Sequence, residues 1–294
     1  MIKTPITRSS IEHIRLPFSF FLLPIFLLAL VSAGAFDPVK AWIVFFVLHF
    51  LLYTASNGFN SFYDRDRESI GALRRPLPVA PDLLWFSLAL DAAAVLAAFF
   101  VGWRFALGCF IYGLASKAYS WNTVRIKRHP VVGWLWAGIG QGTFTFLLVV
   151  LSVNNMQVRD LAIFRFLFPA TATGLFLLGI FPLTQIYQHR EDARRGDVSI
   201  SLFLGIKKTM TLAAVLMAAG LTGFFYFFLA SFGVAPAAWF AVASLPAAIY
   251  FVFWFFAVLG DEKRADFDRT MLMNLIASGG LNLWCVAMLL LEAH

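Results

Sequence analysis

Three oxygen-bearing side chains recur at helical spacing in one short segment. Asn60, Asp64 and Glu68 are each four residues apart, soon after an apolar run. If that run continues as a helix, an amide oxygen and two carboxylates share one helical face. Hard oxygen donors flanked by arginines suit a divalent cation that also holds a phosphate. The alternative interpretation is a solvated helix end of mixed charge.

A second polar stripe leaves an apolar run near residue 185. Gln185, Gln188 and Asp192 are spaced at i, i+3 and i+7, which again places them on one helical face. Exposing such a stripe to lipid is costly, so we expect it to face a cavity or polar partners. Two acidic stripes facing each other would repel, and a pair of Mg²⁺ ions bridging to a diphosphate would remove that repulsion. A wet helix end at the membrane interface is the alternative.

A basic segment lies between the two stripes. It runs from Tyr119 to Pro130 and contains Arg125, Lys127 and Arg128. Arginine forks and the point charge of a lysine are suited to holding phosphate oxygens. The alternative is that these residues only anchor the chain at a membrane surface.

The composition indicates that membrane helices must position these residues. Of the 294 residues, 61% are hydrophobic and only 13% are charged, with a mean hydropathy of +0.80. A soluble domain has roughly 25% charged residues. The basic residues behind the net charge of +7 occur in short clusters between apolar runs. This distribution argues against a nucleic-acid-binding surface and instead indicates how the chain is oriented in the membrane. Cys109 and Cys285 lie inside apolar runs, so no disulfide framework is expected.

The sequence contains nine apolar runs of the kind that cross a hydrocarbon core, for which a helix needs about 20 residues. Uniformly apolar runs predict helices rather than barrel strands. We therefore predict an all-α integral membrane bundle of nine transmembrane helices, with residues 1–294 forming a single domain. The predicted spans are Leu16–Ala35, Ala41–Asn57, Leu83–Val101, Phe105–Tyr119, Val131–Val153, Leu161–Gln185, Met210–Ser231, Ala237–Leu259 and Thr270–Leu291.

Basic residues are unequally divided between the two sets of loops. Nineteen of the 23 lysines and arginines fall on one side, and only Lys40, Arg104, Arg159 and Arg165 fall on the other. The positive-inside rule then places the N-terminus and the four long loops in the cytoplasm. These loops carry most of the acidic and amide groups, so we expect a cytoplasmic active-site cap. The first run has an alternative interpretation as a signal peptide with small residues at its end, although it is long for one.

The motifs together resemble those of the UbiA superfamily of intramembrane prenyltransferases. That family has an Asn-x-x-x-Asp-x-x-x-Asp motif followed by Arg-Pro-x-Pro, a Tyr-Ser pair before Arg-x-Lys-Arg, an early Arg-x-Pro, and a second Asp-x-x-x-Asp motif before a glycine. The matching positions are Asn60, Asp64, Glu68, Arg75-Pro76-Leu77-Pro78, Tyr119-Ser120, Arg125-Ile126-Lys127-Arg128, Arg15-Leu16-Pro17, Gln188, Asp192 and Gly196.

Two positions depart from the family pattern. Glu68 replaces an aspartate with a longer side chain of the same charge, and Gln188 replaces an aspartate with a neutral amide. The second stripe therefore has one negative charge fewer. Because ligand charge contributes to cation affinity, we expect a weaker second metal site and a divergent branch of the family.

The resemblance implies Mg²⁺-dependent transfer of a prenyl group from an allylic prenyl diphosphate to a lipophilic or aromatic acceptor within the membrane. It implies that Asp64, Asp192 and Lys127 are catalytic. The implied metal ligands are Asn60, Asp64, Glu68, Gln188 and Asp192. The implied diphosphate-binding residues are Arg15, Arg75, Tyr119, Arg125 and Lys127. The expected partners are both substrates and membrane lipid, without nucleic acid. We expect a multi-pass integral membrane protein, located in the inner membrane if the source is bacterial.

Two other functions remain open on the same residues. One is a terpene cyclase on the same scaffold, in which the cation is captured within one molecule. The other is a non-catalytic lipid-binding or transport protein, which the lost charge at Gln188 would suit. A transporter would more naturally show internal repeats, and none is clear in the sequence.

Overall fold

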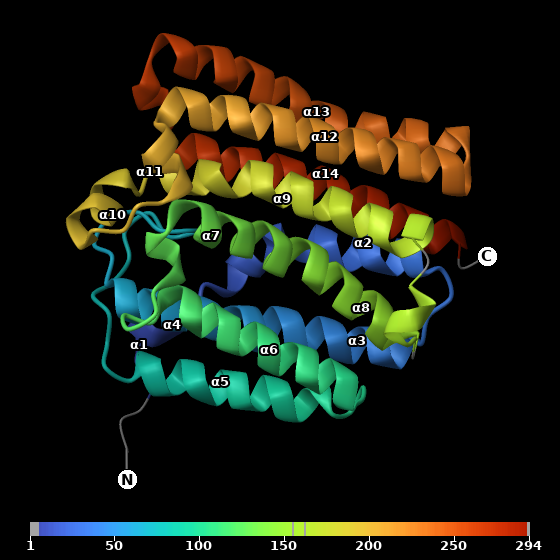
Figure 1. The fold of residues 1–294 in the computed structure, drawn as a ribbon, viewed down its shortest axis with the longest axis horizontal. Helices are drawn as coiled ribbons and strands as arrows, with labels where there is room; N and C mark the ends of the chain where they lie inside the picture. Colours follow the sequence, from blue (N-terminus) through green and yellow to red (C-terminus); the bar gives the residue numbers. More distant parts are fainter. Residues whose placement is uncertain (1–5, 155, 162, 293–294) are drawn as a thin grey trace.

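The computed structural model describes residues 6–154, 156–161 and 163–292, and within these ranges the chain forms helices and no β-sheet. The long helices run side by side along one axis of the molecule (Figure 1). They are α2 (Leu23–Ala33), α3 (Pro38–Phe46) with η2 (Val47–Leu52) and α4 (Tyr53–Asp64), α5 (Leu83–Ala98), α6 (Trp103–Ser120), α7 (Pro130–Leu135) with η4 (Trp136–Phe144) and α8 (Thr145–Val153), η6 (Ile163–Leu167) with α9 (Phe168–Ile186), α12 (Ile206–Phe232), α13 (Val234–Gly260) and α14 (Phe267–Glu292). The short helices are α1 (Arg8–His13), η1 (Leu16–Phe21), η3 (Ile126–Arg128), η5 (Val158–Asp160), α10 (His189–Arg195), α11 (Ile200–Leu204) and η7 (Glu262–Arg264). The predicted all-α class is confirmed.

Six helical segments are each long and apolar enough to cross a membrane. The bent pair of residues 8–21 and 23–33 would make a seventh span. α5 is apolar but has only 16 residues, and α6 carries Arg104 and Lys117. Helices nevertheless lie over all nine predicted runs in the described part of the chain. The structure thus supports an integral, multi-pass membrane protein.

The centre of the bundle is tightly packed around α9, which contacts both α12 and η4. η4 is π-helical and contains three glycines, Gly138, Gly140 and Gly142. A Cβ atom added to Gly142 would lie 3.0 Å from the Cα atom of Gly174 in α9, a distance that only glycine tolerates without movement. π-helical turns inside a helix are frequent at functional sites. Here the wide turn and the close approach together form one wall of the interior.

One ion pair is buried between two helices of the bundle. Lys117 near the end of α6 donates to the carboxylate of Asp91 in the middle of α5, and also to the carbonyl of Gly113 at 3.3 Å. The Lys117 and Asp91 side chains are only 19% and 13% exposed. Since a lone charge is costly in a membrane helix, the pair holds α5 against α6.

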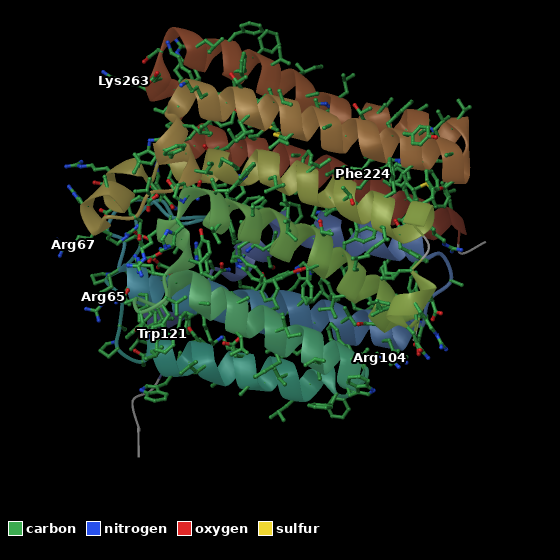
Figure 2. All side chains as sticks on the ribbon, in the orientation of Figure 1. Arg65, Arg67, Arg104, Trp121, Phe224 and Lys263 are labelled. Carbon is green, nitrogen blue, oxygen red and sulfur yellow. The ribbon has the colours of Figure 1, made fainter. Side chains whose placement is uncertain are left out.

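The two ends of the bundle differ in charge and in structure. Figure 2 shows Arg65, Arg67 and Lys263 at one end and Arg104 at the other. The end with Arg65 also carries α10 and α11 (Figure 1). We call the connecting segments at this end, residues 65–82, 121–129 and 187–205, the cap. The cap covers the ends of α4, α6 and α9, where the predicted site residues lie.

Candidate active site

The first predicted stripe is broken at the end of α4. The helix ends at Asp64 because Arg65 adopts the left-handed conformation, with φ at +50°, and reverses the chain. The expectation that Glu68 shares a helical face with Asn60 and Asp64 is therefore wrong. Glu68 is 37% exposed at the surface and pairs with Arg190 and Arg194 of α10, at 3.2 and 3.7 Å.

Asp66 takes the inward position that Glu68 was expected to fill. Its side chain is buried and pairs with Arg195 of α10. Burial raises the pKa of Asp66, the neighbouring charge of Asp64 raises it further, and Arg195 partly offsets both effects. Sequence analysis missed this residue because an unbroken helix would have turned it away from the stripe.

The second predicted stripe is also divided between two helices. α9 ends at Ile186, and Gln188 is the residue before α10 begins. Gln185, Gln188 and Asp192 therefore do not share one helical face, contrary to the spacing argument. All three nevertheless line the same cavity, because the turn at residues 187–188 brings α10 back over the end of α9.

That cavity has a volume of about 210 Å³ and lies under the cap. Its polar end is lined by five residues from the predicted set: Asn60, Asp64, Lys127, Gln188 and Asp192. Arg15 and Tyr119, also predicted, line it as well. Three predicted residues do not line the cavity in the described structure: Glu68, Arg75 and Arg125. Arg75 is exposed in the cap.

The rest of the cavity is apolar and reaches into the bundle. Its walls include Phe21, Ile25, Leu177 and Phe224, from η1, α2, α9 and α12. Figure 2 places Phe224 in the half of the bundle away from Arg65. The cavity thus joins a charged end at the cap to a hydrocarbon-like interior. Sequence analysis assigned no aromatic residue to it, because most of the 34 phenylalanines of such a chain face lipid or neighbouring helices.

Asp64 has three polar partners at this end of the cavity. It accepts a hydrogen bond from Asn60 Nδ2 at 2.9 Å and from Arg125 Nη2 at 3.2 Å, and it pairs closely with Lys127. Asn60 also donates to Ser120 Oγ at 2.9 Å, which ties α4 to α6. The carboxylate is thus held in place by its own helix and by the cap segment 121–129.

Arg125 lies behind this wall, outside the cavity lining. Its left-handed backbone, with φ at +41°, turns the side chain toward Asp197 just after α10. Nε and Nη2 form a two-pronged ion pair with the Asp197 carboxylate at 2.6 and 2.7 Å. Burial alone would raise the pKa of Asp197, but the hydrogen bonds from Arg125 and the charge of Lys127 hold it below its ordinary value. Asp197 was not predicted, since no spacing relates it to residue 125.

Arg195 joins the acidic groups of the cap to one another. It donates to Asp192 Oδ1 at 2.8 Å, to Asp197 Oδ2 at 3.3 Å and to the backbone carbonyl of Asp64 at 3.4 Å, besides its pair with Asp66. Asp64 and Asp192 are therefore bridged by one side chain. Burial raises the pKa of Asp192 to about 6, with only partial relief from Lys127 and Arg195.

Arg15 is a buried cation at the edge of the cavity. Its side chain is 7% exposed and reaches only the Asn57 carbonyl at 3.3 Å and Asn60 Oδ1 at 3.4 Å. Nε has no hydrogen-bond partner among the described residues. Since an unpaired buried charge is expensive, this guanidinium suits an anionic ligand.

The residues present fit a hard divalent cation. No group of three or more His, Cys, Asp or Glu side chains forms a ready-made metal cluster within the described residues. The cavity nevertheless collects the carboxylates of Asp64 and Asp192 with the amides of Gln185 and Gln188, while the carboxylate of Asp197, also in the lining, is paired with Arg125. Oε1 of Gln185 is buried without a partner among the described groups. An incomplete, all-oxygen donor set is typical of Mg²⁺, which keeps several waters and shares phosphate oxygens.

Sequence comparison with known proteins identifies the family to which the chain is similar. Residues 21–276 match the sequence model of the UbiA prenyltransferase family. Digeranylgeranylglyceryl phosphate synthase of Thermococcus kodakarensis is 30% identical over 110 residues, which make up 36% of this chain and 38% of that protein. The chain thus matches little more than a third of that curated relative.

Solved structures share the fold across nearly the whole chain. A UbiA homolog from Archaeoglobus fulgidus bound to DMAPP and Mg²⁺ covers 95% of this chain and 98% of its own, with a TM-score of 0.68 and 17% identity. A UbiA homolog from Aeropyrum pernix K1, solved in its apo form, covers 92% and 98%, with a TM-score of 0.67 and 22% identity. At these identities the likeness is one of fold alone. Because the family match covers most of the sequence as well, the chain belongs to the UbiA prenyltransferase family.

Proposed function

We propose that this protein transfers a prenyl group from an allylic prenyl diphosphate to a lipophilic or aromatic acceptor in the membrane, with Mg²⁺. Family membership supports prenyl transfer. Relatives of the same fold from Archaeoglobus fulgidus were solved with DMAPP, GPP and Mg²⁺.

The observation that carries the proposal is that one continuous cavity has a charged end and an apolar end. Asp64, Lys127 and Asp192 form an end that suits a metal-bound diphosphate, and the apolar walls suit an isoprenoid tail. At about 0.8 kcal/mol per buried CH₂, a tail of many carbons favours such a cavity strongly over water.

The roles of the residues follow from where they lie. Asp64 and Asp192 hold Mg²⁺, together with the amide groups of Asn60 and Gln188. When bound, Mg²⁺ offsets the negative charge that develops on the leaving diphosphate. Arg15 and Lys127 contact the diphosphate oxygens, since both line the cavity and Arg15 forms no ion pair with a described residue. Tyr119 borders the same end.

The remaining predicted residues act on the site from outside the cavity. Arg125 positions Asp64 from behind the cavity wall, and it is held there by Asp197, a carboxylate that itself lines the cavity. Glu68 links residues 65–82 of the cap to α10 rather than binding the metal, and Arg75 is exposed in the cap. This assignment revises the roles that the resemblance implied for Glu68, Arg75 and Arg125.

The chemical step is a substitution at the allylic carbon. The bond between this carbon and the diphosphate oxygen breaks and its electron pair leaves with the diphosphate. The acceptor then forms a new bond to the allylic carbon and releases a proton. The apolar walls keep water from the cationic carbon, and aromatic faces such as those of Tyr112 and Trp136 in the lining stabilise it.

We also place the protein with its cap and N-terminus in the cytoplasm. The basic residues at the cap end support this orientation, because positive loops are retained on the cytoplasmic side. A water-soluble diphosphate then reaches the cap from the cytoplasm, while its tail and the acceptor remain in the membrane.

The test uses the purified full-length chain in lipid nanodiscs with radiolabelled geranyl or geranylgeranyl diphosphate. With Mg²⁺ and an extract of membrane lipids, we expect diphosphate release and a labelled lipid product, and neither with EDTA. A labelled hydrocarbon formed without any acceptor would instead identify a cyclase. No diphosphate release under any condition would contradict the enzymatic proposal and favour a lipid-binding protein.

A further inference from the structure

Two neighbouring arginines of α10 lie in opposite environments. The Arg194 side chain is 49% exposed and pairs with Glu191 at 3.1 Å and with Glu68 at the surface. The Arg195 side chain is only 16% exposed and contacts the carboxylates of Asp66, Asp192 and Asp197. Arg195 is therefore built into the site, and Arg194 provides a matched control one residue away.

The acidic groups near α10 are already occupied by this guanidinium. Gln188 supplies no charge, so a second metal ion would depend on Asp192, Asp66 and Asp197. Arg195 donates to Asp192 Oδ1 at 2.8 Å and to Asp197 Oδ2 at 3.3 Å, and it pairs with Asp66. A divalent cation at these oxygens would have to displace a buried guanidinium, which would then lie unpaired beside another positive charge.

Asp64 offers a different environment. Oδ2 of Asp64 pairs with Lys127, which lines the cavity and can turn to a phosphate oxygen once a metal binds Asp64. Oδ1 lies 3.2 Å from Arg125, whose guanidinium keeps the Asp197 carboxylate as a partner when a metal takes its place. Arg195 does not belong to the cavity lining in the described structure, and it has no such alternative partner. Asp64 can thus accept a metal, whereas Asp192 can contribute only its Oδ2 atom, because Arg195 holds Oδ1.

We propose that Arg195 is a fixed cation in the place of a second metal ion, so that the site binds one Mg²⁺ rather than a pair. The inference rests on the proposed function for the first ion, held by Asp64 with a contribution from Asp192. Arg195 is a positioning residue: it orients Asp192 and neutralises the acidic groups of the cap without touching substrate. This revises the pair of ions that two facing acidic stripes led us to expect.

The decisive measurement is the number of Mn²⁺ ions bound per chain. Mn²⁺ suits the same oxygen ligands as Mg²⁺ and is visible by electron paramagnetic resonance. The probe is the full chain in nanodiscs, titrated with Mn²⁺ in the presence of an unreactive geranyl thiolodiphosphate. We expect one ion per chain. Two ions would overturn this inference and leave the proposed function intact, whereas no binding would overturn the metal assignment of the proposed function itself.

A paired set of variants tests the role of the guanidinium. In the double variant Gln188→Asp with Arg195→Met, a carboxylate is restored and the blocking charge removed, so we expect two Mn²⁺ ions per chain. Gln188→Asp with Arg194→Met should remain at one ion, because Arg194 touches none of these three aspartates. A folded Arg195→Met double variant that still binds one ion would overturn the inference. If that variant does not fold, the count on the unaltered chain still decides.

Discussion

Arg125 donates two hydrogen bonds to the Asp197 carboxylate, from Nε to Oδ1 at 2.6 Å and from Nη2 to Oδ2 at 2.7 Å. The same Nη2 lies 3.2 Å from Oδ1 of Asp64 at the end of α4. One side chain thus joins three segments that are far apart in the sequence: the end of α4, the loop before η3 and the residue pair after α10. The position of the proposed metal-binding carboxylate depends on this junction.

Breaking the junction on one side should destabilise the protein strongly. Arg125→Met leaves Asp197 buried without its partner, and removing one member of a buried ion pair costs about 3 kcal/mol or more. We expect a clearly lower Tm in detergent. The double variant Arg125→Met with Asp197→Asn should recover part of the loss, because it no longer strands a charge. Equal Tm values for the single variant and the unaltered chain would show that the pair contributes little.

Arg15 should affect substrate binding more than stability. Its guanidinium is buried without an ion pair in the described structure, so Arg15→Met removes a buried charge that only the more distant carboxylates of Asp64 and Asp66 offset. We expect an unchanged or higher Tm. A hydrogen bond to a charged group contributes about 1.5 kcal/mol or more, so KM for the prenyl diphosphate should rise at least about tenfold. A variant with unchanged KM but reduced Tm would assign Arg15 to the fold instead.

Asp64 and Glu68 should respond very differently to loss of charge. Asp64→Asn removes a buried carboxylate of the cavity, and we expect diphosphate release to fall about 100-fold or more, as for other groups that stabilise transition-state charge. Glu68 lies in an exposed ion pair, which contributes about 1 kcal/mol or less, so Glu68→Gln should change the rate by less than about fivefold. Comparable losses in the two variants would restore Glu68 to the metal site.

The Asp91–Lys117 pair should matter for assembly of the bundle and not for chemistry. Lys117→Met strands the Asp91 carboxylate between α5 and α6, at a cost of about 3 kcal/mol. The double variant with Asp91→Leu should return most of the lost Tm, since an apolar pair replaces the ionic one. Turnover per folded molecule should stay within about twofold in the double variant. A large loss of turnover there would give this pair a role in the reaction.

The sequence was sufficient for the class of fold and for most of the residues around the cavity. Apolar runs separated by charged loops are a strong signal, and they located the helices. Residue spacing gave a wrong prediction where a helix ended without the glycine, asparagine or proline that usually marks a helix end. Arg65 adopts a left-handed conformation that glycine or asparagine would more normally mark, so neither the end of α4 nor the inward turn of Asp66 was foreseeable.

Pairings across the fold were equally out of reach. Nothing in a single sequence relates Arg125 to Asp197, or distinguishes Arg195 from the adjacent Arg194. These contacts arise when the loop after α6 and the end of α10 meet above α4. Periodicity identifies which face a residue occupies on its own helix, and it cannot identify the partner that another segment brings.

The central claim is that Asp64 and Asp192 bind the same metal–diphosphate group although they come from separate segments. Anomalous diffraction from Mn²⁺ in crystals of the full chain with geranyl thiolodiphosphate tests it directly. We expect a metal peak in the cavity at coordination distance from both carboxylates, about 2.1 Å for Mg²⁺ and slightly longer for Mn²⁺. A metal bound at Glu68 on the surface, or a diphosphate seated away from Asp64 and Asp192, would contradict the account.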